Sequence, residues 1–161
     1  MIPSFVSDSG PTRRYGTRGT LLGLNLGTSR GEIYRAALEG LSYQLRHALE
    51  VLTDSTGEAP DSLRVVGGGS KNQLWNRIRA DVTRLPVSTT SQKEATVVGA
   101  AMVAFAGLGL LPSLEDAVGG LEVKTTTYEP GPDSGLYEDR YRAYRQAPPA
   151  LEPAFVEAQR D

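Results

Sequence analysis

The sequence contains no cysteine and a single histidine, His47. Disulfides, thiolate nucleophiles and cysteine- or histidine-rich metal centres are therefore excluded. No apolar run approaches the roughly 18 residues that a membrane-spanning helix needs, and the first residues lack the charged and then apolar layout of a signal peptide. The formal net charge is −2, so no basic excess is present to neutralise a nucleic-acid backbone. We expect a cytoplasmic protein that binds neither membrane nor nucleic acid.

What the chain does have is a composition that suits one globular domain. It has 161 residues, of which 39% are hydrophobic and 22% are charged, and this is enough to bury a substantial core. Strand-like and helix-like segments alternate, which favours an α/β architecture in which helices cover a sheet. We expect strands at residues 20–26, 63–66, 87–90 and 123–128 and helices at residues 30–52, 71–84 and 95–106.

The organisation along the chain predicts three parts. Residues 1–18 look irregular, residues 19–128 form the main domain, and residues 129–161 form a helical tail that packs on the same domain. In the tail, Tyr137, Tyr141 and Tyr144 recur at helical spacing, so we expect them to face the domain. Pro148 and Pro149 are expected to stop that helix.

Three helix starts carry the capping-box pattern, in which a serine is followed three residues later by glutamate or glutamine. The pairs are Ser29 with Glu32, Ser70 with Gln73, and Ser91 with Glu94. The helix expected after the third pair is almost free of polar residues. We therefore expect it to be the most buried helix of the domain.

The most informative segment is a run of three glycines, Gly67, Gly68 and Gly69, which follows a short β-branched strand and precedes a helix. Its spacing matches neither the phosphate-binding loop of nucleotide triphosphatases nor the dinucleotide fingerprint. A tight turn is one interpretation. The other is a bare ledge on which main chain approaches a nucleotide beside a helix terminus.

Two side chains near these glycines bear on that choice. Asn72, a short amide at the helix start, can hydrogen-bond a ribose or a base edge. Trp75, one turn further on, suits packing better than base stacking. No pair of carboxylates, metal-ligand cluster or nucleophile–base arrangement emerges, so the residues alone predict no catalytic apparatus.

Four motifs, at residues 18–24, 34–41, 66–76 and 94–101, resemble in order and spacing the C-terminal domain of the FGGY carbohydrate kinases. The resemblance covers about residues 15–160 and implies a ribonuclease-H-like, actin-like ATPase fold with a mixed sheet and covering helices. It implies that Gly68 and Gly69 lie against the nucleotide, that Gly67 and Ser70 shape the turn, and that Asn72 contacts adenine or ribose. Glu94 and Gly99 would support the helix behind the site.

The resemblance also implies a reaction, the transfer of the ATP γ-phosphate to a sugar hydroxyl between two domains that close around ATP, Mg²⁺ and the sugar. The segment at residues 66–76 and the ending at residues 151–157 favour kinases of L-fuculose or a related ketose. The catalytic aspartate, the sugar contacts and the phosphate loops are not matched here.

We therefore expect the chain to be the last third of a kinase, inactive without an N-terminal partner domain that holds the sugar, and not itself a ligand of Mg²⁺. Surface that normally meets that partner would be exposed, so a homodimer is expected. The alternative is a non-catalytic nucleotide- or protein-binding module derived from such a kinase.

Overall fold

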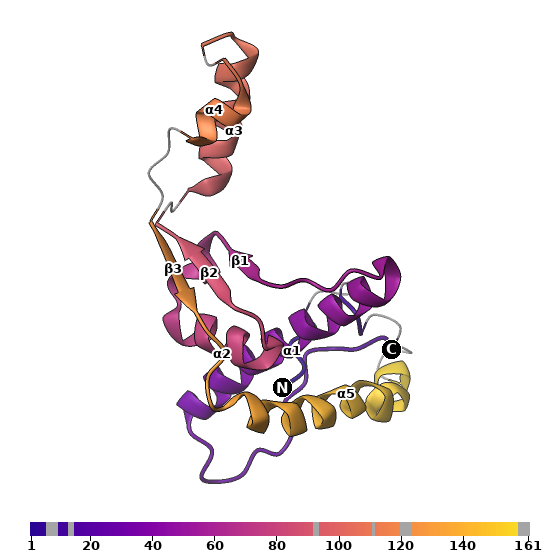
Figure 1. Ribbon diagram of the computed structural model, residues 1–161. Coiled ribbons are helices and arrows are strands. Elements are labelled where there is room, and N and C mark those ends of the chain that lie inside the picture. Colours follow the sequence, from indigo (N-terminus) through magenta and orange to yellow (C-terminus); the bar gives the residue numbers. More distant parts are fainter. Residues whose placement is uncertain (6–9, 13–14, 92–93, 111, 120–123, 158–161) are drawn as a thin grey trace.

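The computed structural model of the chain describes residues 1–5, 10–12, 15–91, 94–110, 112–119 and 124–157. These residues form α-helices, one 3-10 helix and a small sheet (Figure 1). In chain order the elements are α1 (Arg30–Thr56), β1 (Leu63–Val65), η2 (Gly68–Lys71), α2 (Gln73–Thr83), β2 (Val87–Thr90), α3 (Ala95–Gly107), α4 (Leu114–Gly119), β3 (Thr125–Tyr128) and α5 (Ser134–Glu157).

The sheet is mixed, with β2 in its centre. β1 pairs with β2 in parallel and in the register Leu63 opposite Val87, whereas β3 pairs with β2 antiparallel, Thr90 opposite Thr125. β2 has the bounds expected from the sequence, and β3 begins at Thr125, two residues later than expected. Val123 lies outside the described residues.

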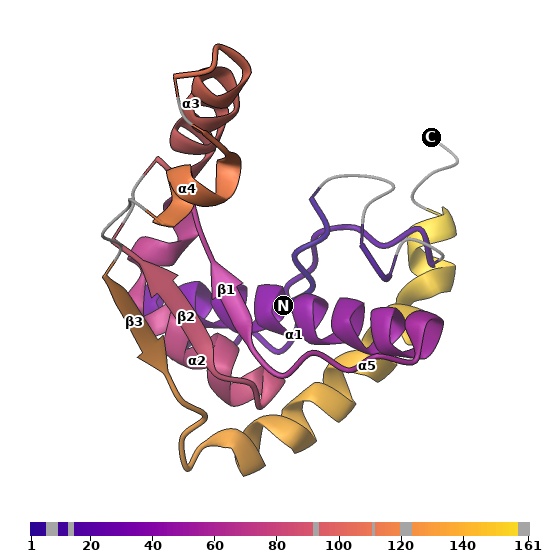
Figure 2. The same cartoon turned by 45° about the horizontal axis from the view of Figure 1, so that its top comes forward.

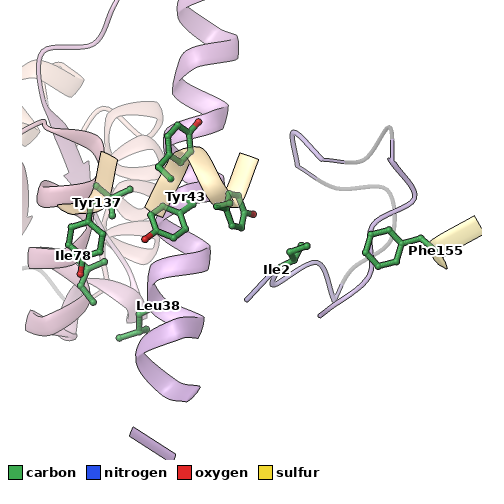
Figure 3. Close-up of a cluster of buried hydrophobic side chains, with 9 residues drawn as sticks. Ile2, Leu38, Tyr43, Ile78, Tyr137 and Phe155 are labelled. Atoms are coloured by element: carbon green, nitrogen blue, oxygen red, sulfur yellow. The ribbon is translucent and has the colours of Figure 1, made fainter. Parts of the chain in front are cut away.

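Helices cover this sheet as the sequence predicts. α2 contacts β2 and β3, α1 packs on α2, and α5 lies along both α1 and α2 (Figures 1 and 2). The core lies between these three helices, where Tyr43 of α1 meets Tyr137, Tyr141 and Tyr144 of α5 at ring-centroid distances of 6.3, 5.9 and 5.1 Å. Leu38 and Ile78 complete it (Figure 3). The expected inward face of the three tail tyrosines is thus confirmed.

The strand expected at residues 20–26 is wrong. Only Thr20 pairs, in an isolated antiparallel bridge with Ile2, and the leucines that follow are exposed, Leu26 completely. A strand needs a neighbour to bond its backbone groups, and the described residues offer one only at Thr20. The bridge draws Ile2 into the core, where it is 1% exposed.

The expectation that the helix at residues 95–106 is the most buried is also wrong. α3 contains no buried residue, and together with α4 it stands out beyond the end of the sheet as an arm (Figure 1). Val97, Val103 and Phe105 are 65%, 61% and 47% exposed. The helix is apolar, as its sequence indicates, but the short α4 packs against it without burying any of its residues. None of the described helices combines the length and hydropathy needed to span a bilayer.

The prolines do not stop the tail helix. α5 continues through Pro148, Pro149 and Pro153 to Glu157. A proline inside a helix costs about 3 kcal/mol because it lacks an N–H and crowds the preceding turn. Here Pro148 is fully buried and Phe155 joins the core cluster, so packing outweighs the local penalty.

Candidate functional site

The glycine turn lies where β1 ends and α2 begins. Gly67 has φ 78° and ψ −164°, a conformation that is essentially restricted to glycine. The 3-10 helix η2 follows, and Asn72 is both the C-cap of η2 and the N-cap of α2. The order strand, glycine turn, helix is therefore confirmed, with a 3-10 helix inserted before α2.

Two of the three glycines are bare. A Cβ placed on Gly67 or on Gly68 would meet no atom within 4 Å, and both residues are exposed. Gly69 is backed on one side, because a Cβ there would lie 3.1 Å from Cζ3 of Trp75 and 3.2 Å from Nη2 of Arg79. The turn is thus a main-chain ledge with one supported side and one open side, and we call residues 67–69 the glycine ledge.

Ser70 closes the ledge instead of capping α2. Its Oγ donates to the carbonyl oxygen of Gly67 at 2.7 Å, and its N–H donates to the same oxygen at 3.1 Å. The capping box predicted for Ser70 and Gln73 is therefore wrong, since the side chain of Ser70 is engaged within its own turn. These bonds hold Ser70 against the main chain of Gly67, and its role in nucleotide binding stays a prediction.

Asn72 is the actual N-cap of α2. Its Oδ1 accepts from the backbone N–H of Trp75 at 3.1 Å, which satisfies a free donor of the first helical turn. Its Nδ2 donates to the hydroxyl of Tyr34 at 2.7 Å, and Tyr34 belongs to the first turns of α1. Both ends of the amide are fixed, beside the ledge.

Trp75 and Arg79 form the support behind the ledge. The guanidinium carbon of Arg79 lies 3.6 Å from the centroid of the Trp75 ring, and its Nη1 donates to the carbonyl oxygen of Gly69 at 3.3 Å and to Oδ1 of Asn76 at 2.8 Å. Burial lowers the pKa of the Arg79 guanidinium below its ordinary value. The indole N–H of Trp75 donates to the buried hydroxyl of Ser42 at 3.2 Å.

These contacts favour packing over base stacking for Trp75, because Arg79 lies on one face of its ring and the side chain packs against the core cluster. Asn76 adds a further restraint, since its Nδ2 donates to the carbonyl oxygen of Ser70 at 2.8 Å and its side chain is fully buried. Sequence reasoning missed Tyr34, Asn76 and Arg79 as neighbours of the turn. Asn76 and Arg79 follow Asn72 at helical spacing and were identifiable as the same face, whereas Tyr34 is distant in the sequence.

Glu94 and Gly99 lie in the arm. Glu94 caps α3 through its backbone carbonyl only, because its side chain makes no capping hydrogen bond, and the Oγ of Ser91 instead accepts from the N–H of Lys124 at 3.1 Å. The capping box predicted for Ser91 and Glu94 is therefore wrong. Among the described residues, neither Glu94 nor Gly99 forms a hydrogen bond with residues 67–72.

The chemistry available at the ledge is that of binding. Open glycine main chain beside a helix start suits the polar parts of a nucleotide, and the free space above Gly67 and Gly68 is the space that a Cβ would fill. Within the described part of the chain, no group of three histidine or carboxylate side chains is placed to hold a metal ion.

The sequence of the chain is similar to that of known carbohydrate kinases. Residues 1–108 match the model of the FGGY family of carbohydrate kinases, C-terminal domain. The chain is 43% identical to the L-fuculokinase of Haemophilus influenzae over 100 residues, which are 62% of this chain and 21% of that protein. It is 32% identical to the glycerol kinase of the same organism over 147 residues, 91% of this chain and 29% of that protein.

Solved structures agree in fold. The structure of Plasmodium falciparum glycerol kinase with ADP superposes with a TM-score of 0.74 at 26% identity, over 91% of this chain and 29% of that one. A xylulose kinase from Rhodospirillum rubrum gives a TM-score of 0.70 at 32% identity, over 87% and 28% of the two chains. The chain thus spans between a fifth and a third of the length of these relatives.

Proposed function

Because the chain belongs to the FGGY family of carbohydrate kinases, whose C-terminal domain it carries, we propose that it holds the adenosine part of ATP or ADP on the glycine ledge. In this role Gly68 and Gly69 lie against the nucleotide, Gly67 and Ser70 fix the turn, and Asn72 contacts adenine or ribose. The mixed sheet with covering helices is that of the family's actin-like ATPase domain. The observation that carries the proposal is the open space over Gly67 and Gly68.

The physical basis is close approach. A side chain at position 67 or 68 would keep a flat ligand at least a carbon diameter from the main chain, whereas glycine permits van der Waals contact. The relative from Plasmodium falciparum was solved with ADP, which supports an adenine nucleotide as the ligand of the corresponding domain here.

The reaction that this domain would serve is transfer of the γ-phosphate of ATP to a sugar hydroxyl. Phosphoryl transfer depends mainly on positioning and on charge stabilisation around the phosphates. The described residues supply the nucleotide ledge but no metal cluster. We therefore propose that a separate N-terminal kinase domain supplies the catalytic aspartate and the sugar site and closes over the nucleotide. Mg²⁺ would accompany the phosphates at that domain.

The sugar that we propose is L-fuculose or a related ketose. The support is the 43–44% identity to L-fuculokinases over about 60% of the chain, compared with 32% to a glycerol kinase. Because the sugar contacts are expected in the N-terminal domain, this part of the proposal depends on sequence similarity alone.

The arm formed by α3 and α4 supports the need for a partner. Leu108 and Leu110 at its end are 73% and 66% exposed, in addition to the apolar side chains of α3. Large apolar side chains exposed in this number on one arm are typical of an interface. We propose that it meets the N-terminal kinase domain, and that in isolation it mediates self-association.

Two measurements test the function. First, ADP is titrated into the ¹⁵N-labelled chain, and we expect the amide signals of residues 67–72 to shift while those of α5 do not. Second, the N-terminal domain of a related L-fuculokinase is added as a separate chain, and we expect ATP-dependent phosphorylation of L-fuculose to appear. No ADP binding at millimolar concentration, together with no restored activity, would favour the alternative of a non-catalytic interaction module.

A further inference from the structure

Tyr34 contacts the nucleotide-facing region although it lies far from the glycines in the sequence. It lies in the first turns of α1 and is 54% exposed, so about half of the residue is available to solvent or to a ligand. Its hydroxyl is 2.7 Å from Nδ2 of Asn72. An exposed tyrosine ring is thus fixed at one end to the residue that borders the glycine ledge.

The hydrogen bonds determine which way the Asn72 amide faces. Its Oδ1 accepts from the backbone N–H of Trp75 at 3.1 Å, which turns this oxygen toward the start of α2. Its Nδ2 carries two N–H groups, and one donates to the Tyr34 hydroxyl. The second has no partner among the described residues. The amide therefore offers a ligand the second N–H of Nδ2 as a donor, and its Oδ1 keeps one lone pair beside the bond from Trp75.

We infer that Tyr34 is a positioning residue for the nucleotide, which holds the Asn72 amide with its free N–H toward the ledge and supplies an aromatic face for the base. This inference rests on the proposed function of the ledge. The ligand class that fits is a purine nucleotide that presents an acceptor, either a ring nitrogen of adenine or a ribose oxygen, to Asn72. Stacking on a tyrosine face is favourable for any base, so the donor supplies the orientation.

Replacement of Tyr34 by phenylalanine separates the two contributions. Tyr34→Phe keeps the ring and removes the hydroxyl, so the Asn72 amide loses one of its two restraints. We expect ADP affinity to fall about threefold to tenfold, the effect of one net hydrogen bond, with an unchanged thermal midpoint. The side-chain amide signals of Asn72 should shift even without ADP. Tyr34→Ala, which also removes the ring, should weaken ADP binding further.

Two further variants make the test specific. Tyr128→Phe, in β3, is the matched control, and it should leave both ADP affinity and the Asn72 signals unchanged. Asn72→Asp retains a good helix cap but replaces the donor by an acceptor. We expect it to keep the thermal midpoint and to lose ADP affinity more severely than Tyr34→Phe.

The outcomes are separable. If the wild-type chain binds ADP and Tyr34→Phe binds it equally well, the positioning role is overturned while the proposed function stands. If Asn72→Asp binds ADP as tightly as the wild-type chain, the donor orientation is wrong. If the wild-type chain does not bind ADP at millimolar concentration, the proposed function and this inference fail together.

Discussion

Gly67 and Gly68 are adjacent and equally bare, but their backbones differ. Gly67 adopts φ 78° and ψ −164°, whereas the φ of Gly68 lies outside the left-handed region. At neither position does any atom lie within 4 Å of the methyl group that alanine would add, so the substitution creates no clash at either one. Any difference in stability between Gly67→Ala and Gly68→Ala therefore reports backbone conformation alone.

The difference in stability has two opposing contributions. Forcing a residue with a Cβ into the conformation of Gly67 costs about 1–3 kcal/mol. Replacing glycine also removes freedom from the unfolded chain, which stabilises by about 0.4–1 kcal/mol. We expect Gly67→Ala to lower the free energy of unfolding by roughly 1–2 kcal/mol, or the midpoint by about 2–8 °C for a chain of this size. Gly68→Ala should be neutral or slightly stabilising.

Thermal and urea unfolding followed by circular dichroism measure both variants. Gly135→Ala, at a helical and uncrowded position of α5, serves as the control for the general effect of adding a methyl group. Equal midpoints for Gly67→Ala and Gly68→Ala would refute the assigned conformation of the turn, since strain at Gly67 is then absent.

Three other predictions concern the packed tyrosines and the arm. The Tyr43 hydroxyl is buried without a hydrogen-bond partner in the described structure, so Tyr43→Phe should stabilise by about 1 kcal/mol in urea unfolding; a loss of stability would show that the hydroxyl is bonded. Burial raises the pKa of Tyr144 from 10.0 to about 12. The unfolded chain therefore releases this proton first, and the free energy of unfolding should fall as the pH rises from 10 to 12; an identical slope in Tyr144→Phe would contradict the cause. Finally, sedimentation velocity should show concentration-dependent association that the double variant Val103→Glu, Phe105→Glu abolishes, and a wild-type chain that stays monomeric at high concentration would exclude self-association through the arm.

Local sequence patterns predicted those features whose hydrogen bonds are local. The capping box of Ser29 and Glu32 forms in full, with the N–H of Glu32 donating to Oγ of Ser29 at 3.2 Å and the N–H of Ser29 donating to a carboxylate oxygen of Glu32 at 2.8 Å. The same pattern at Ser70 and Gln73 does not form a capping box, because the hydroxyl of Ser70 donates to the carbonyl oxygen of Gly67 within the turn. Asn72 then takes over as the cap.

Features that depend on a distant partner were not predictable from a local pattern. The run at residues 20–26 has the composition of a strand, but only Thr20 finds a strand neighbour. Pro148 and Pro149 have the composition of a helix end, but the burial of Pro148 and Phe155 keeps α5 helical. Tyr34 and Asn72 are 38 residues apart in the sequence. The periodicity of apolar residues within either helix therefore does not predict their contact.

At the candidate site, the resemblance supplied the residues and the structure supplied their restraints. Gly67, Gly68, Gly69, Ser70 and Asn72 are adjacent in sequence, so their proximity in space was certain. The support from Trp75 and Arg79 depends on where α2 begins, and the third restraint, Tyr34, depends on how α1 packs against α2.

The central claim is that adenine nucleotide lies directly on the main chain of the glycine ledge. Isothermal titration of ADP into the wild-type chain, Gly68→Ala and Gly135→Ala tests it most directly, because both substitutions are expected to leave the fold intact and only the first adds an atom above the ledge. We expect saturable binding by the wild-type chain and by Gly135→Ala, and a loss of at least about tenfold, or 1.4 kcal/mol, in Gly68→Ala. Equal affinities in all three chains would contradict it.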